Sequence, residues 1–191
     1  MSPRLRAALG SLLFLVAAPG VVAGLIPWSL TRWELEEPFP LWAPLRVVGA
    51  VLIAVGVLAL LDSFRRFVVE GLGTPAPVAP TEELVVTGLY RYVRNPMYVA
   101  VAATIFGQAL LLGHVELFAY GAVFVGVVAA FVRWYEEPTL ARTYGEQYAE
   151  YRRSVPGWIP RRPSASGNPS SPRGRPGPPP EPADPPAASE R

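Results

Sequence analysis

Four long blocks of apolar residues constrain the fold of this chain of 191 residues more than any other feature. They run from Leu5 to Pro27, from Trp42 to Phe64, from Met97 to Leu112 and from Val115 to Val132. At a helical rise of about 1.5 Å per residue, the first reaches roughly 34 Å, the third roughly 24 Å and the fourth roughly 27 Å, close to the thickness of a bilayer core. The pattern predicts an all-α integral membrane protein with four transmembrane helices.

The first block has a second interpretation, as a signal peptide cleaved after Ala23. Its apolar run continues to Trp28 without a polar break, however, and this favours a span that is retained. The third and fourth blocks are separated only by Gly113-His114, so we expect a tight helical hairpin in which His114 is a solvated turn residue.

An amphipathic helix is predicted from Thr139 to Val155, after the hairpin. The side chains that share one helical face are Tyr144, Tyr148, Tyr151 and Val155. We expect this helix to lie in the membrane interface and to stop at Pro156, since proline disrupts helices.

The composition excludes several classes of site. There is no cysteine and only one histidine, so we expect no disulfide bond and no bound metal. All 17 basic residues are arginines that flank the apolar blocks and form no soluble basic face, so nucleic-acid binding is not expected. If the amino terminus is inside, only Arg32 and Arg46 lie outside, which predicts a multi-pass protein of the inner or plasma membrane with both termini in the cytoplasm.

A cationic and aromatic stretch, Gly88 to Tyr98, precedes the third block. Its eleven residues include the two arginines and three tyrosines Arg91, Arg94, Tyr90, Tyr92 and Tyr98. Separate structural interpretations exist: Asn95-Pro96 can cap and start a helix, the arginines can anchor a span, and the tyrosines can form an aromatic belt. A helix amino terminus with nearby arginines is also suited to bind an anion.

Two adjacent glutamates, Glu136 and Glu137, follow the fourth block. Carboxylates at the carboxyl end of a helix oppose its dipole, and at membrane depth they are functional candidates. Pro138 predicts that the helix breaks at Glu137. A structural alternative is an ion pair between Glu137 and Arg133, one turn earlier. Trp134 and Tyr135, which precede the glutamates, are expected to face a cation.

The predicted topology brings both clusters to the cytoplasmic face, as one shared site requires. These motifs, together with Tyr144-Gly145 and Val155-Pro156, resemble the isoprenylcysteine carboxyl methyltransferase family, to which the phospholipid N-methyltransferases are related. The family pattern is Arg-His-Pro-x-Tyr before a helical hairpin and Glu-Glu after it. This chain has Asn95 in place of the histidine, and an amide can hydrogen-bond but cannot be protonated near neutral pH.

The resemblance covers roughly residues 71 to 162 and implies a methyltransferase-like core. It implies S-adenosylmethionine as the cofactor, with a pocket formed by Tyr90, Arg94, Asn95, Tyr98, Glu136 and Glu137. Two transmembrane helices in residues 1–70 precede this core, which begins with an extended loop from Gly71 to Pro80. A proline-rich tail, residues 163–191, follows it and is expected to be disordered.

The leading hypothesis is an integral-membrane methyltransferase that acts on a lipophilic acceptor within membrane lipid. The acceptor is a carboxylate, such as an isoprenylcysteine-like group, or a lipid amine. The alternative is a non-catalytic membrane scaffold, or a partner protein of the same fold, which the asparagine at position 95 motivates. A third interpretation is a membrane reductase of the sterol type, for which the chain is short.

Overall fold

The computed structural model of the chain describes residues 16–69 and 84–161, and within these ranges it contains helices and no strand. The elements are η1 (Val16–Leu25), α2 (Ile26–Thr31), α3 (Ala43–Val69), η2 (Gly88–Arg91), α4 (Pro96–Leu112), α5 (Glu116–Phe131), η3 (Val132–Glu136), α6 (Glu137–Tyr144) and α7 (Glu146–Ser154). The all-α prediction is therefore confirmed over the described part. The start of the first apolar block, the Gly71–Pro80 loop and the proline-rich tail lie outside it.

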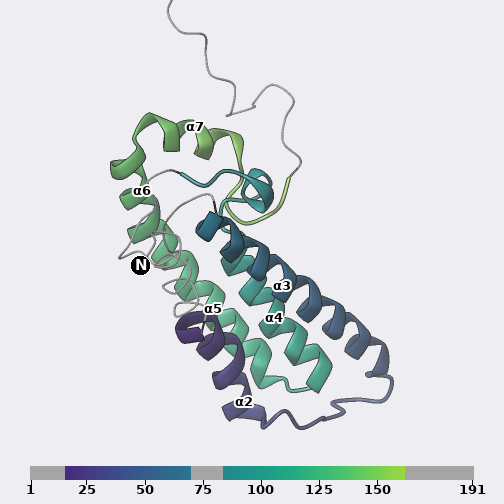
Figure 1. The fold of residues 1–191 in the computed structure, drawn as a ribbon. Helices are drawn as coiled ribbons and strands as arrows, with labels where there is room; N and C mark the ends of the chain where they lie inside the picture. Colours follow the sequence, from purple (N-terminus) through teal and green to yellow (C-terminus); the bar gives the residue numbers. More distant parts are fainter. Residues whose placement is uncertain (1–15, 70–83, 162–191) are drawn as a thin grey trace, which may run out of the picture.

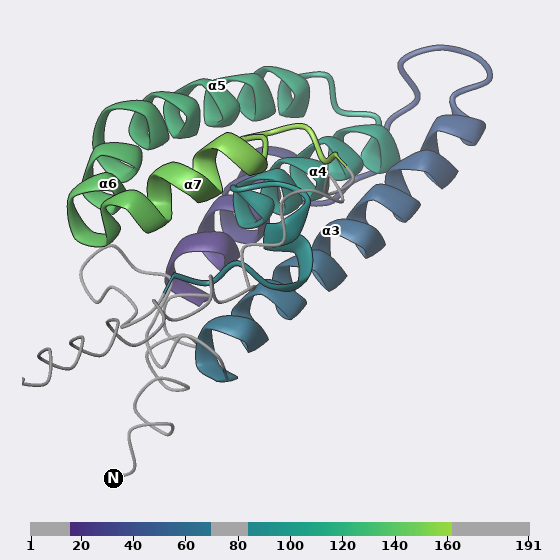
Figure 2. The same ribbon diagram turned by 90° about the horizontal axis from the view of Figure 1, so that it is seen from above.

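Helix α4 is the centre of an elongated bundle (Figure 1). It packs against α3 on one side and α5 on the other, and it also contacts η1 (Figure 2). Its central residue Ile105 is completely buried, together with Ala109. The predicted hairpin of α4 and α5 is formed, and Gly113 ends α4 in a left-handed conformation, with a φ of 87°, that glycine adopts easily.

Close packing of α3 on α4 depends on glycines. A Cβ atom added to Gly49 would lie 2.5 Å from the carbonyl oxygen of Gly107, and one added to Gly56 would lie 2.6 Å from the hydroxyl of Thr104. The two backbones can approach this closely only because these positions have no side chain. Gly107 contributes to the same contact, because a Cβ atom added to it would lie 2.8 Å from the carbonyl oxygen of Gly49.

Two helical segments are long and apolar enough to cross a membrane: Ala43–Arg66 and Glu116–Tyr144. The other apolar segments, Val16–Thr31 and Pro96–Leu112, are shorter. Between Val47 and Leu61 of α3, the exposed side chains are aliphatic, among them Val51. An exposed apolar surface of this kind is what a lipid-facing helix presents.

The predicted break at Glu137 is wrong. The helix runs from α5 into α6 without interruption, through the π-helical turn η3. In that turn the backbone N–H of Glu137 bonds to the carbonyl of Val132, five residues earlier. Pro138 then lies in the first turn of α6, directly after the π-helical turn, where the shifted hydrogen-bond pattern accommodates its missing N–H.

The amphipathic segment is two helices, and not the single one expected from Thr139 to Val155. Gly145 separates α6 from α7 with a φ of 53° and a ψ of −124°, a conformation that favours glycine. Its predicted apolar face exists, since Tyr148 and Tyr151 are buried. This face packs on residues 84 and 86 and is therefore covered by protein. The position of the segment in the membrane interface stays a prediction.

His114 is buried, with 5% of its surface exposed, which contradicts the expected solvated turn residue. Its Nδ1 lies 2.7 Å from a carboxylate oxygen of Glu116, and its Nε2 lies 3.1 Å from the carbonyl oxygen of Glu34. The connector between α2 and α3 folds over the α4–α5 turn and covers it: Glu36 donates its N–H to the carbonyl of Leu112. This contact is between segments far apart in sequence, so local patterning gave no sign of it.

Candidate functional site

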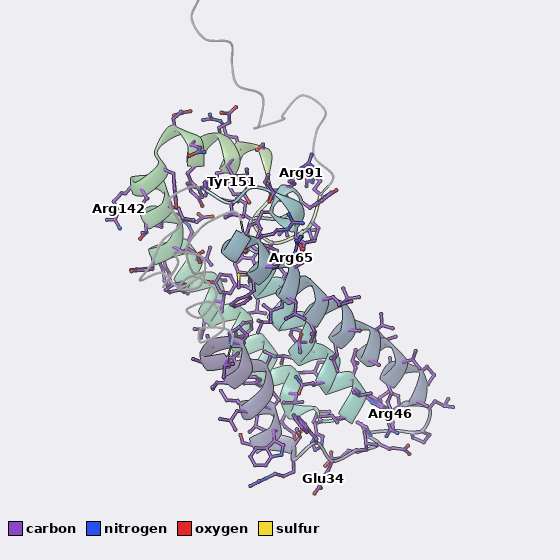
Figure 3. All side chains as sticks on the ribbon, in the orientation of Figure 1. Glu34, Arg46, Arg65, Arg91, Arg142 and Tyr151 are labelled. Atoms are coloured by element: carbon purple, nitrogen blue, oxygen red, sulfur yellow. The ribbon has the colours of Figure 1, made fainter. Side chains whose placement is uncertain are left out.

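The stretch around η2 and the segments α6 and α7 lie at the same end of the bundle (Figure 1). In Figure 3, Arg91 and Tyr151 mark this end, and Glu34 and Arg46 mark the opposite end. The η2 stretch leads directly into α4, because Pro96 occupies the first turn of that helix, as predicted. Segments more than 35 residues apart in sequence therefore contribute to one polar cluster at this end.

Two interactions join the cationic stretch to the glutamate pair. The hydroxyl of Tyr98 donates a hydrogen bond of 2.9 Å to a carboxylate oxygen of Glu136. The guanidinium of Arg94 lies 2.9 Å from a carboxylate oxygen of Glu137. The two clusters that the sequence analysis assigned to one site are therefore in direct contact.

The two glutamates have different partners. Glu137 has an 11% exposed side chain and pairs with Arg94 and, at 3.5 Å, with Arg152. Glu136 is partly buried, accepts the hydrogen bond from Tyr98, and has no ion pair with any residue of the two described ranges. The anticipated Arg133–Glu137 pair is not formed. Since burying a carboxylate without a cation costs free energy, Glu136 is the group in this cluster that lacks a partner of opposite charge.

Arg94 connects three segments. Besides the ion pair with Glu137, its guanidinium donates a hydrogen bond of 3.3 Å to the hydroxyl of Tyr148, on α7. Its backbone N–H donates to the carbonyl of Pro156 at 2.8 Å. The Nε–H of Arg94 is buried and has no hydrogen-bond partner in the described part of the chain. Arg94 thus fixes α7 and the following segment against the start of α4, and one of its donors is still unused.

Asn95 is the N-cap residue of α4, and its carbonyl accepts the N–H of Val99 at 3.2 Å, but its side chain makes no capping hydrogen bond to the helix. The amide nitrogen of its side chain instead donates to the carbonyl of Gly157 at 3.0 Å. Its backbone N–H bonds to the same carbonyl at 3.2 Å. Asn95 is buried and serves as an anchor for a segment 62 residues later in the sequence.

Tyr90 lies in the interior of the cluster. Its backbone carbonyl accepts a hydrogen bond of 2.8 Å from the hydroxyl of Tyr151. Burial, and the nearby groups of Tyr151 and Glu136, raise the pKa of Tyr90 well above its usual range. Both phenols therefore stay neutral near pH 7, and neither supplies a charge to the site.

The other candidate aromatics are outside this cluster. Trp134 is 78% exposed and Tyr135 is 50% exposed, so their rings are not buried together with the glutamates. That these two rings face a cation stays a prediction. Arg91 and Tyr92 are exposed as well. The ring of Trp158, which the sequence analysis did not single out, lies near that of Tyr98, with 6.5 Å between ring centres and 33° between planes.

Sequence reasoning also missed Arg152 and Gly157. Arg152 belongs to the polar face of α7, which gave it the pattern of a solvated residue. For Gly157, the available signal was the Pro156-Gly157-Trp158 sequence, in which turn-forming residues place a tryptophan directly after a helix. In the described ranges no group of three or more histidine, aspartate or glutamate side chains is arranged to hold a metal ion.

Comparison with known protein families matches residues 45–147, more than half of the chain, to the phospholipid methyltransferase family. The matched region begins in α3 and ends in α7, so it contains the Arg94–Tyr98 stretch and both glutamates. It starts earlier than the resemblance noted from the motifs, which began near residue 71. No curated protein sequence matches the chain.

Proposed function

This chain belongs to the phospholipid methyltransferase family, and on that premise we propose that it transfers a methyl group from S-adenosylmethionine to a lipophilic acceptor. Family membership and the two long apolar helices indicate a membrane methyltransferase. The proposal extends this conclusion to the cofactor, the residues that bind it and the class of acceptor.

The observation that carries the proposal is the unpaired carboxylate of Glu136. It contacts Tyr98 but no cationic group of the described residues, although its neighbour Glu137 has two arginines within 4 Å. A ligand with a positive charge supplies the missing partner. S-adenosylmethionine has two such charges, a sulfonium and an ammonium.

We assign the six predicted residues as follows. Glu136, with Tyr98 as its hydrogen-bond donor, binds a cationic group of the cofactor. Arg94 offers its buried Nε–H to the cofactor carboxylate and holds Glu137 in place. The two remaining residues, Tyr90 and Asn95, shape the pocket through the contacts described above.

When bound, the cofactor would supply a methyl group activated by its sulfonium: the bond from that carbon to sulfur would break, leaving a neutral thioether, as the acceptor bonds to the carbon. The protein therefore has to align the two reactants and keep water away. If the acceptor is a carboxylate, such as an isoprenylcysteine-like group, no general base is required. If it is a lipid amine, a proton has to leave, and the partly buried carboxylate of Glu136 would accept it.

A membrane arrangement with four spans agrees with this chemistry. In it, η1–α2, α3, α4 and the α5–α6 helix cross the bilayer, and both termini lie in the cytoplasm of a cell whose inner or plasma membrane holds the protein. Residues 1–70 then anchor the core at 71–162, and residues 163–191 form a tail. Cofactor reaches the site from the cytoplasm and the lipophilic acceptor from the bilayer. A reporter fused after residue 162 should read as cytoplasmic, and a periplasmic signal would contradict this orientation.

The test of function uses the full-length protein purified in detergent. We expect it to bind S-adenosylmethionine, and to transfer a labelled methyl group to a component of a membrane lipid extract. Glu136→Gln keeps the size of the side chain but removes its charge, so cofactor affinity should fall roughly 10- to 100-fold, the value of one charge-assisted hydrogen bond.

Glu146→Gln is the matched control, because Glu146 is an exposed glutamate of the neighbouring helix that pairs only with Arg153 among the described residues. It should leave cofactor affinity unchanged. A wild-type protein that binds no S-adenosylmethionine would refute the proposal and favour the non-catalytic scaffold. Equal affinity in the wild type and in Glu136→Gln would refute the assignment of the site.

A further inference from the structure

The segment Pro156–Arg161, called the strap below, lies along the residues that precede α4. Arg94 and Asn95 donate their backbone N–H groups to the carbonyls of Pro156 and Gly157, at 2.8 and 3.2 Å. The bonds resemble those between paired strands, although the strap is not a strand. It is thus held directly against the two residues that begin the candidate site.

Two further contacts fix the strap. Its last residue, Arg161, donates its N–H to the carbonyl of Tyr92 at 3.0 Å. Near its start, the carbonyl of Gly157 receives a second hydrogen bond, from the side-chain amide of Asn95 at 3.0 Å. A Cβ atom at Gly157 would lie 3.2 Å from the guanidinium of Arg94, so a larger residue at this position would press against that side chain.

These contacts determine where Trp158 lies. It is partly buried, whereas the next residue, Ile159, is 79% exposed. Its ring is 6.5 Å from that of Tyr98, the residue whose hydroxyl bonds to Glu136. A tryptophan and a tyrosine therefore accompany the carboxylate that lacks a cationic partner.

We propose that Trp158 is an aromatic wall of the site that receives a methylated cation at Glu136. This inference rests on the proposed function. Tryptophan attracts a cation over its ring face more strongly than the other aromatic residues, and a carboxylate beside it adds charge attraction. The cation is the sulfonium of the cofactor or an alkylated ammonium of the acceptor, two sources of the same chemistry. Asn95 is a positioning residue that holds the strap, and so the indole, in place.

The first arm of the experiment separates charge from shape. The full-length wild type, Trp158→Leu and Trp158→Phe are compared for binding of S-adenosylmethionine and of S-adenosylhomocysteine, which lacks the sulfonium charge. If Trp158 faces the sulfonium, Trp158→Leu should lower the affinity for S-adenosylmethionine about 3- to 30-fold more than the affinity for S-adenosylhomocysteine. Trp158→Phe keeps an aromatic ring and should retain most of this preference.

The second arm uses tetramethylammonium chloride as a probe that requires no cofactor. Its stabilising effect on thermal unfolding is measured against equal sodium chloride. If Trp158 instead faces the ammonium of an acceptor, Trp158→Leu should abolish this stabilisation and leave the preference for S-adenosylmethionine unchanged. If neither measurement responds to Trp158→Leu, the proposal is wrong.

The two arms also distinguish the inference from the function on which it rests. A wild type that binds no S-adenosylmethionine contradicts the proposed function, and the tetramethylammonium arm still tests the aromatic wall. A wild type that binds the cofactor, with no effect of Trp158→Leu in either arm, contradicts the wall alone.

Asn95→Ala tests the positioning role. It should reduce the same preference for the charged ligand, whereas Asn95→His, which can still donate to the carbonyl of Gly157, should restore it. A purely structural role would change the thermal stability of Asn95→Ala but not the ratio of the two affinities. An unchanged ratio would therefore remove Asn95 from the proposal.

Discussion

Acidic side chains lie at both ends of the α4–α5 hairpin, but their carboxylates have different partners at the two ends. At one end, His114 is placed between the carboxylate of Glu116 and the carbonyl of Glu34. At the other, Arg94 balances Glu137, but Glu136 has a neutral hydroxyl as its partner. Figure 3 shows how far apart the ends are, with Glu34 at one and Tyr151 at the other.

At the histidine end, the carboxylate of Glu116 has a cationic partner in the imidazole of His114. Both ring nitrogens of His114 face oxygen acceptors, so both must carry a proton for the two bonds to form, and the imidazole is then a cation. Burial lowers the pKa of His114, but Glu116 and the backbone of Glu34 raise it by more, and the net shift is upward. A cluster that satisfies its own charges holds a turn together, and one that leaves a carboxylate unmatched is suited to a ligand.

The largest expected effect is a difference in stability between variants of Glu137 and of Glu136. Glu137→Gln leaves the guanidinium of Arg94, which is 14% exposed, with no ion pair of its own. It should lower the free energy of unfolding by about 3 kcal/mol, as for other broken buried pairs. Glu136→Gln removes a charge that has no partner, and it should leave stability unchanged or slightly raised.

The measurement is denaturant unfolding of the purified protein in detergent micelles, with Glu146→Gln as the exposed control. Equal destabilisation by Glu136→Gln and Glu137→Gln would show that the two carboxylates are balanced alike. The contrast between the ends of the hairpin would then disappear.

Tyr151→Phe is expected to have the next largest effect. It removes the hydrogen bond that the Tyr151 hydroxyl donates to the carbonyl of Tyr90, a buried residue, at a cost of about 1.5 kcal/mol. Calorimetry should show the lower midpoint of thermal unfolding. Tyr92→Phe is the control, because that side chain is exposed and should tolerate the change. A midpoint equal to that of the wild type would mean that the carbonyl finds water instead.

His114→Gln tests the end of the hairpin that contains the histidine. The amide cannot carry the charge that both acceptors require, but Glu116 is 47% exposed and solvent screens much of the loss. We therefore expect a decrease in stability of about 1 kcal/mol, with cofactor binding unaffected, because the site is at the other end. Weakened binding of S-adenosylmethionine in this variant would link the two ends and contradict the division of roles.

The smallest effect is a pH dependence. Because the folded pKa of His114 is raised above its unfolded value near 6.5, its stabilising contribution is complete below that pH. The contribution is lost as pH rises through the folded pKa. Unfolding free energies of the wild type and His114→Gln, measured from pH 5.5 to 8.5, should therefore converge as pH rises. A difference that grows with pH would mean that the imidazole is neutral when folded.

Patterns of neighbouring residues were enough to predict much of the fold. The apolar blocks gave the helices, Gly113 gave the end of α4, and the spacing of Tyr148 and Tyr151 gave the buried face of the last helix. The motifs also indicated that Arg94 and the two glutamates belong together. Such signals are periodic or local, so they are read from residues a few positions apart.

Contacts between remote segments decided the rest. The sequence could not show which glutamate is paired, because both have the same neighbours and only Glu137 meets Arg94 and Arg152. Nor could it show that Asn95 binds Gly157, since an asparagine before a proline suits a helix cap equally well.

The sequence by itself determined where the helices form and which polar groups flank them, because these depend on local propensity and on transfer of apolar residues out of water. Only the tertiary structure decided which charges are satisfied within the chain. Ion pairs form between groups that folding brings within 4 Å, and for Glu137 and Arg94 that approach follows from how α4 packs on α5, the helix that continues into α6.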